Sequence, residues 1–208
     1  MYRNYLFLFT ILMLFSCSPY RTLVVKNDLQ EIYDLAVKDA AEPLPNEISS
    51  DLRPLTNYNE TLQHNDNGQI LVVTWTSWNG YDQLIGKETT LSREVWITSA
   101  PQLQNFSERL NLDSAKMVLR LEQLMGLPPN TGKNRFVEMW VNPADLFRPC
   151  PDPEIIDNNC NLEFPESSHI SIAAEHKKWI ADLKAKSYGE NGYPWTQLGY
   201  TYDWGNPK

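Results

Sequence analysis

The 208-residue sequence contains few cysteines and few basic side chains. With only three cysteines it is not a small fold held by many disulfides, and its length can bury a sizeable core without them. Its 18 Lys and Arg residues are outnumbered by 26 Asp and Glu residues, which gives a formal net charge of −8. This acidic balance does not support a broad basic surface, so no nucleic-acid partner is expected.

The sequence also lacks the short motifs that mark common catalytic sites. It has no Gly-x-Ser-x-Gly, no His-Glu-x-x-His and no Gly-x-Gly-x-x-Gly pattern. His169 and His176 would lie about 10.5 Å apart along one helix, too far to share a metal ion. Asp152, Glu154 and Asp157 lack the spacing of an EF-hand calcium loop. No catalytic residue, metal site or cofactor is therefore predicted.

A long hydrophobic run is missing as well, but a short one stands at the N-terminus. After the basic residue Arg3, the chain is apolar from Tyr5 to Phe15 except for Thr10. As a helix this run is roughly 16 Å long, whereas the hydrocarbon core of a bilayer is about 30 Å thick. A basic start followed by a short apolar segment is typical of a secretory signal.

The end of this run, Leu14-Phe15-Ser16-Cys17, resembles the lipobox of bacterial lipoproteins. The resemblance covers only the first 17 residues. It implies that residues 1–16 are a signal peptide cut before Cys17, which then receives a thioether-linked diacylglycerol and an N-acyl chain. An ordinary secretory signal with an incidental cysteine and an uncleaved anchor are the alternatives.

Lipidation at Cys17 would place the protein in the cell envelope, anchored to a bacterial membrane and facing the periplasm or the exterior. Each buried CH₂ group contributes about 0.8 kcal/mol, so two or more acyl chains hold a protein stably. Removing residues 1–16 takes away Arg3 and leaves 17 basic and 26 acidic residues, a charge of −9. Anionic headgroups would repel such a body. Residues 17–27 are therefore expected to be a lipidated cysteine and a tether, with membrane lipid as the partner of Cys17.

The two remaining cysteines, Cys150 and Cys160, are expected to form a disulfide. Export would bring them into an oxidising compartment, where such pairs persist. The segment between them is rich in turn-forming residues and contains two prolines. On the chain-entropy model, closing a loop of this length stabilises by about 3 kcal/mol.

Residues 28–208 are expected to form a single domain of the α+β (or mixed α/β) class. Helical and strand patterns interleave without an internal repeat, which predicts a central, mostly buried sheet and about four helices. The apolar run 70–78 fits a strand covered on both faces, because it does not alternate with polar residues. The expected helices span 28–41, 101–110, 113–125 and 171–186, and the expected strands span 70–78, 94–98, 136–141 and the tail at 193–204.

Aromatic residues are the remaining signal. Trp75, Trp78, Trp96 and Trp140 fall in or beside expected strands and are predicted to pack in the core. In the tail, aromatic residues alternate with glycine and polar residues, which predicts a strand with its apolar face on the core. The alternative is a ligand surface of exposed rings. That surface would consist of Trp195, Tyr200, Tyr202 and Trp204.

Three hypotheses for function follow. The leading one is a membrane-tethered extracytoplasmic lipoprotein with a binding or structural role. The second is an envelope hydrolase acting on a glycan or a peptide, for which convergent carboxylates or a histidine in a cleft would be required. The third is a glycan-binding module that uses the C-terminal aromatic residues. The sequence identifies neither the protein nor the glycan that would be the partner.

Overall fold

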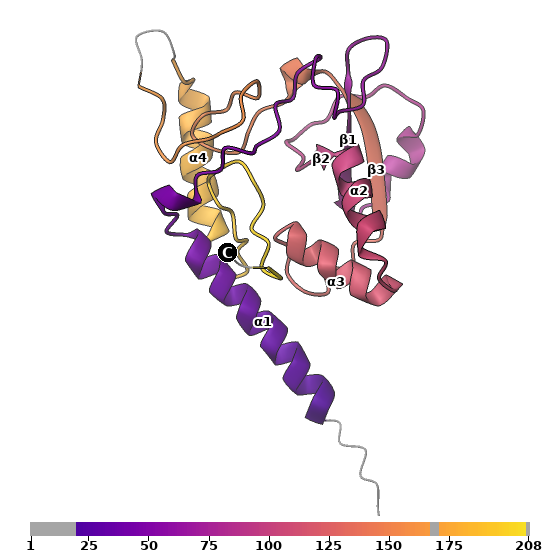
Figure 1. The fold of residues 1–208 in the computed structure, drawn as a ribbon, viewed down its shortest axis with the longest axis vertical. Helices are drawn as coiled ribbons and strands as arrows, with labels where there is room; N and C mark the ends of the chain where they lie inside the picture. The colour runs from indigo at the N-terminus through magenta and orange to yellow at the C-terminus, as the bar shows by residue number, and fades with distance from the viewer. Residues whose placement is uncertain (1–19, 167–170, 207–208) are drawn as a thin grey trace, which may run out of the picture.

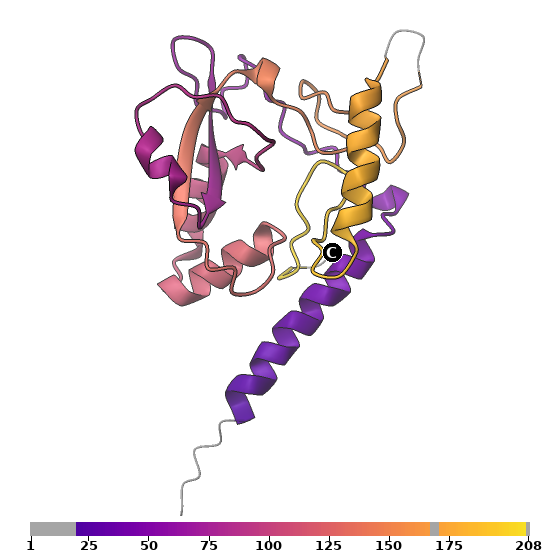
Figure 2. The same ribbon diagram turned by 180° about the vertical axis from the view of Figure 1, so that it is seen from behind.

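The computed structural model describes residues 20–166 and 171–206, so Cys17 and the expected signal peptide lie outside the described residues. Within that part of the chain, helices and a small antiparallel sheet form one α+β domain, as predicted (Figure 1). Figure 2 shows the same arrangement from behind. The helices are α1 (Tyr20–Ala40), α2 (Ala100–Leu110), α3 (Ser114–Leu124) and α4 (Ala174–Ser187). The strands are β1 (Ile70–Thr76), β2 (Thr98–Ser99) and β3 (Arg135–Val141).

The strand β1 lies in the middle of the sheet, whose order is β2-β1-β3. It pairs antiparallel with β3 from Ile70↔Val141 to Thr76↔Arg135, and with β2 at Val73↔Thr98. Every residue of β1 except Thr76 is buried. The continuous apolar run therefore marks a central strand covered on both faces, as expected.

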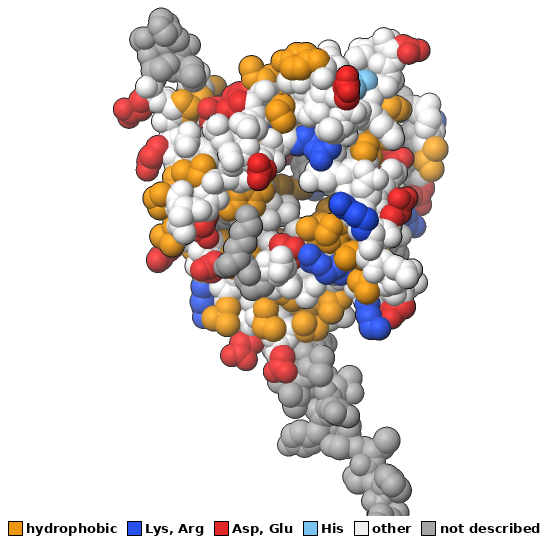
Figure 3. Space-filling model, in the orientation of Figure 1, with side chains coloured by type: hydrophobic (Ala, Val, Ile, Leu, Met, Phe, Trp, Pro, Cys, Tyr) orange, Lys and Arg blue, Asp and Glu red, His pale blue; other side chains and the backbone are white. Residues whose placement is uncertain are grey.

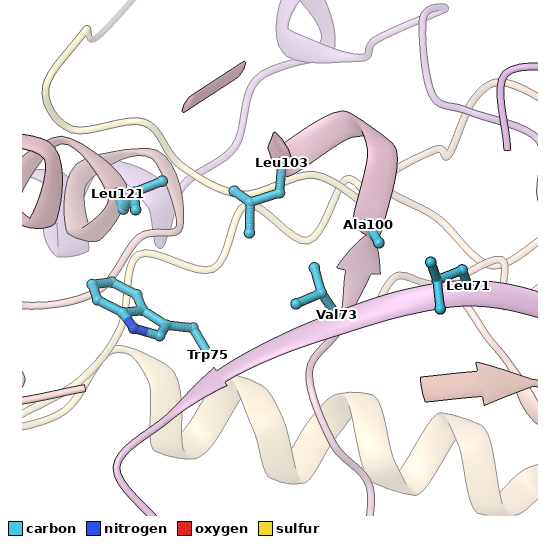
Figure 4. Close-up of a cluster of buried hydrophobic side chains, with 6 residues drawn as sticks. All are labelled: Leu71, Val73, Trp75, Ala100, Leu103 and Leu121. Carbon is cyan, nitrogen blue, oxygen red and sulfur yellow. The ribbon is translucent and has the colours of Figure 1, made fainter. Parts of the chain in front are cut away.

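Helices α2 and α3 cover one face of the sheet. Leu71, Val73 and Trp75 of β1 point toward Leu103 and Leu121 of the two helices and form the main buried cluster (Figure 4). On the opposite face, Ile70 and Val72 pack with Leu62 from the preceding loop. Because successive side chains of β1 point to opposite faces of the sheet, this strand contributes to two separate hydrophobic cores.

Both of these helices begin and end where local signals in the sequence place them. Pro101 stands in the first turn of α2, where its missing N–H costs nothing. Asp113 caps α3 by accepting a hydrogen bond from the Lys116 N–H at 3.0 Å. Gly126 follows α3 with a φ of 62°, a left-handed conformation that favours glycine.

The first helix is longer than predicted. It begins at Tyr20 and not at Asp28, so the segment expected to be a tether is helical from Tyr20 onward. Asp28 and Glu31 match a capping-box pattern in the sequence, but they lie inside α1 and not at its start. The sequence from Tyr20 to Ala40 contains neither proline nor glycine, so nothing interrupts the helix.

The predicted strand in the tail is wrong. Residues 193–204 make one isolated bridge, between Trp195 and Thr201, and otherwise follow turns. Gln197 and Gly199 have φ values of 62° and 78°, and these left-handed residues reverse the chain between the two bridge partners. The expected strand at 94–98 is also mostly loop, since β2 contains only Thr98 and Ser99.

The prediction that four tryptophans pack in the core holds for one of them. Trp75 is 4 % exposed, but Trp78 is 53 %, Trp96 is 55 % and Trp140 is 44 % exposed. Trp140 lies on β3 at the edge of the sheet, while Trp78 and Trp96 lie in the loop between β1 and β2. On the face shown in Figure 3, apolar side chains are exposed in small groups among acidic and basic ones.

Candidate functional site

The loop between Cys150 and Cys160 is the best-defined feature that the sequence singled out. The two cysteines lie at disulfide-bonding distance, with 6.6 Å between their Cα atoms, and both are buried. The loop is attached to a distant segment of the chain. Leu52 N–H donates to the Asn158 carbonyl at 2.9 Å, and Leu55 N–H donates to the Ile155 carbonyl at 2.8 Å.

A buried arginine organises this loop from inside. The Arg148 guanidinium donates from Nη1 to Asp157 Oδ1 at 2.7 Å and to the Asn159 carbonyl at 2.9 Å. Its Nη2 donates to the Asp157 carbonyl at 2.6 Å and to the Arg53 carbonyl at 3.4 Å. Since these bonds all end on the protein itself, Arg148 has a structural role.

The surroundings of the loop carboxylates shift their pKa values. Burial acts to raise the pKa of Asp157, but the hydrogen bonds with Arg148, the Asn159 N–H and Glu154 together outweigh it and hold the pKa below its ordinary value. Burial raises the pKa of the neighbouring Glu154. Within the part of the chain that is described, Asp157 is therefore a partner of Arg148 and of Glu154.

An aromatic cluster connects the loop to α4 and to the tail. Phe147 lies edge-on to His176 at 5.7 Å and to Trp179 at 5.0 Å between ring centroids. His176 Nε2 lies 2.8 Å from the Cys150 carbonyl, and Trp195 Nε1 donates to the Pro149 carbonyl at 2.8 Å. Both polar ring atoms are satisfied by backbone, so the cluster anchors the loop.

Of the four tail residues that were candidates for a ligand surface, two are buried and two are half-buried. Trp195 is 6 % and Trp204 is 2 % exposed, and both are core residues. The Tyr200 hydroxyl donates to the Glu47 carbonyl at 2.8 Å, and the Tyr202 hydroxyl donates to Asp39 at 2.7 Å. These four rings do not form an exposed row, whereas the expectation that Trp204 and Leu198 pack in the core is confirmed.

The tail also joins the two halves of the fold. Its Asp203 makes a bidentate ion pair with Arg120 of α3, at 2.7 and 2.5 Å. On the other side, Trp204 lies edge-on to Tyr33 of α1 with 5.8 Å between ring centroids. Burial raises the pKa of the tyrosines at this junction above the ordinary value for tyrosine, so they stay neutral. These tyrosines are Tyr33, Tyr188 and Tyr202.

A second buried charge, Glu122 of α3, was not expected from the sequence. It is 2 % exposed and accepts from the N–H groups of Asn130 and Thr131 at 3.0 and 2.7 Å, and from the Thr131 hydroxyl at 2.9 Å. Nearby, burial lowers the pKa of Lys133, whose Nζ donates to the Trp75 carbonyl at 2.9 Å. The apolar helix pattern around Glu122 could have indicated its burial, but not its partners.

Two of the exposed aromatic residues lie at the edge of the sheet. Phe136 and Trp140 of β3 are 51 % and 44 % exposed, with the exposed Glu138 between them. Phe136 stacks on the buried Trp75 at 5.4 Å with an interplanar angle of 8°. The pattern Phe-x-Glu-x-Trp could have indicated this exposed surface, because a charged residue between two aromatic residues is unusual on the buried face of a strand.

The described residues contain no group of three or more His, Cys, Asp or Glu side chains placed to hold a metal ion. No helix among these residues is long and apolar enough to cross a membrane. In comparisons with known proteins, no family model, no curated protein and no solved structure matches the chain.

Proposed function

We propose that this protein is a lipid-anchored protein of the bacterial cell envelope, held to the membrane by acylated Cys17, with a binding or structural role. The observation that carries the proposal is the sequence boundary at residues 14–17, which follows an apolar run too short to span a bilayer. The alternatives for this segment remain an ordinary secretory signal and an uncleaved anchor.

The geometry of α1 supports this mode of attachment. The helix begins three residues after Cys17, and its first half projects away from the body of the fold (Figures 1 and 2). From Asp28 onward, the buried residues of α1 are Tyr33, Ala36, Val37 and Ala40. From Tyr20 to Tyr33 the helix rises about 20 Å, so it would act as a spacer between the membrane and the domain.

The charge of the protein supports the same arrangement. Without residues 1–16 the chain carries a formal charge of −9, which an anionic membrane surface repels. A spacer that keeps the domain at a distance lowers this repulsion, because screening reduces it over a Debye length of about 8 Å at physiological ionic strength.

A binding or structural role is favoured over hydrolysis by the use of the buried charges. Arg148 and Glu122 direct their hydrogen bonds to the backbone and side chains of the fold itself. Catalytic groups, in contrast, direct theirs toward a substrate position. A glycan platform in the tail is not favoured either, since Trp195 and Trp204 are buried.

Metabolic labelling tests the proposal. The full-length protein, expressed in a bacterium and fed an alkyne fatty acid, should carry the label and sediment with membranes. Cys17→Ser should lose the label and move to the soluble fraction, because no other site receives the diacylglycerol. The matched control, Cys150→Ser with Cys160→Ser, should keep the label. Equal labelling of wild type and Cys17→Ser would refute lipidation at this residue.

A further inference from the structure

Among the described residues, no strand pairs with the outer edge of β3. Ile70 of β1 pairs with Val141 of β3 on one side and with His64 on the other. On the His64 side, Leu71 N–H donates to the Gln63 carbonyl at 3.0 Å. Backbone groups of odd-numbered residues of β1 therefore point away from β3, and those of even-numbered residues point toward it.

This alternation fixes which residues of β3 have free backbone groups. The even-numbered residues of β1 pair with odd-numbered residues of β3, such as Val72 with Met139 and Thr74 with Val137. Phe136, Glu138 and Trp140 must then direct their N–H and C=O groups outward. Within residues 20–166 and 171–206, no backbone or side-chain group pairs with them.

The same three residues also expose their side chains. Their neighbours on β1, at positions 71, 73 and 75, are buried under α2 and α3. Phe136 and Trp140 extend this apolar surface past the helices, where they are 51 % and 44 % exposed. An added strand would therefore gain backbone hydrogen bonds and apolar contacts at the same edge.

The charge of Glu138 limits what can bind. It stands between the two rings, and Gln104 of α2 donates from Nε2 to its Oε1 at 2.8 Å, which holds the carboxylate in place. A basic side chain on the added strand, directly opposite Glu138, would pair with it at cross-strand distance. The acidic charge of the whole chain, −8, favours a basic partner further.

A second copy of this chain fits poorly. Pairing two β3 strands so that Phe136 of each lies opposite Trp140 of the other also sets the two Glu138 carboxylates opposite each other. Like charges at directly opposed positions destabilise a strand pair. Shifting the pairing by two residues in either direction places Glu138 opposite Phe136 or Trp140. Glu138 thus protects the edge against self-association.

We propose that the open edge of β3 binds an extended peptide segment that carries Lys or Arg at its central position and an apolar residue two positions away on each side. The segment adds a fourth strand beside β3, with its basic residue on Glu138 and its apolar residues beside Phe136 and Trp140. This site does not depend on the lipid anchor at Cys17, so either proposal can fail alone.

The probe is a fluorescent peptide, Thr-Val-Thr-Arg-Thr-Val-Thr, blocked at both ends and titrated with the full-length protein in detergent micelles. Glu138→Lys should weaken its binding at least tenfold, since it replaces attraction by repulsion. The same variant should bind the peptide with Glu in place of Arg more tightly than wild type does. Glu108→Lys, an equal change of charge at an exposed position on α2, should leave both affinities within about twofold.

Amide hydrogen exchange provides the second readout. The odd-numbered amides of β3 should be protected with or without peptide, and the amides of Phe136, Glu138 and Trp140 should become protected only when peptide is bound. Absence of binding, or binding that leaves these three amides unprotected, would overturn the proposal. Protection that rises with protein concentration alone would assign the edge to a second copy instead.

Discussion

Replacing Trp204 by alanine tests how the tail is integrated into the fold. The indole ring is 2 % exposed and packs in a cluster with Tyr33, Ala36 and Val37 of α1. Its Nε1–H donates to the Leu127 carbonyl at 2.9 Å, in the loop that follows α3. A single side chain therefore joins α1 to the half of the molecule that contains the sheet.

The expected loss of stability can be worked out from these contacts. Truncating a buried tryptophan to alanine costs about 3–5 kcal/mol, through lost burial and the cavity that remains. The Leu127 carbonyl also loses its donor, and an unsatisfied buried acceptor costs about 1–3 kcal/mol. Part of this cost is already included in the range for truncating the side chain. We expect a decrease of about 4 kcal/mol in the free energy of unfolding, or roughly 10 °C in the midpoint for a chain of this size.

Urea unfolding followed by far-UV circular dichroism measures this decrease. Trp204→Phe keeps a ring but removes the N–H donor, so it should lose about 1–2 kcal/mol. Trp96→Ala is the matched control, because that ring is 55 % exposed, and it should change stability by less than about 1 kcal/mol. If Trp204→Ala unfolds at the same urea concentration as wild type, the tail does not have the core role that we assign to it.

Further predictions concern the loop and the tyrosines. Reduction of the disulfide should raise the intact mass by about two units. Replacing Cys150 and Cys160 by serine should lower the free energy of unfolding by about 3 kcal/mol or less. Free thiols in protein purified from membranes would contradict the pairing. Arg148→Met should lower the free energy of unfolding by about 2 kcal/mol, because buried carbonyls lose their donor, and chemical denaturation would show no change if the contacts were unimportant. Burial raises the pKa of Tyr33 and Tyr202 in the folded state, so their contribution to the free energy of unfolding should be complete below pH about 10 and should decrease as the pH rises further. Tyr33→Phe should make this decrease smaller in urea titrations between pH 9 and 11. An unchanged slope would refute the assignment.

Local signals were sufficient to predict β1, α2 and α3. The apolar run at 70–78 contains β1, which ends at Thr76. Pro101 stands in the first turn of α2, and the helix predicted over 113–125 contains α3. The pairing of Cys150 with Cys160 was also predictable, since only these two cysteines remain after Cys17 is assigned to lipidation.

The tail could not be predicted because its alternation has a different cause. Leu198 and Trp204 are both buried, as a strand pattern would suggest, but left-handed turns at Gln197 and Gly199 lie between the bridge partners. The burial pattern results from packing against α1 and α3, which are distant in sequence. An alternation of apolar and polar residues depends only on near neighbours in the sequence, so it gives no information on contacts with distant segments.

The exposure of Trp140 and the burial of Glu122 depend on tertiary arrangement as well. Trp140 has the same neighbours in sequence whether its strand is central or at an edge, and only strand order decides its exposure. Glu122 is buried because the loop at 130–131 folds over it and supplies three donors. Neither fact is contained in the spacing of residues along the chain.

The hydrogen bonds between the two ends of the chain set the order in which it can fold. Tyr33 reaches the Gly192 carbonyl, 159 residues away, and Tyr202 reaches Asp39, 163 residues away. During synthesis, α1 emerges long before the tail residues that it contacts, which include Tyr188, Gly192, Tyr202 and Trp204. Non-local contacts of this kind make folding slow and late. A chain that lacks these tail residues cannot complete the packing of α1, which is compatible with the export that we propose, and a premature stop before Tyr202 would leave α1 more open to proteolysis.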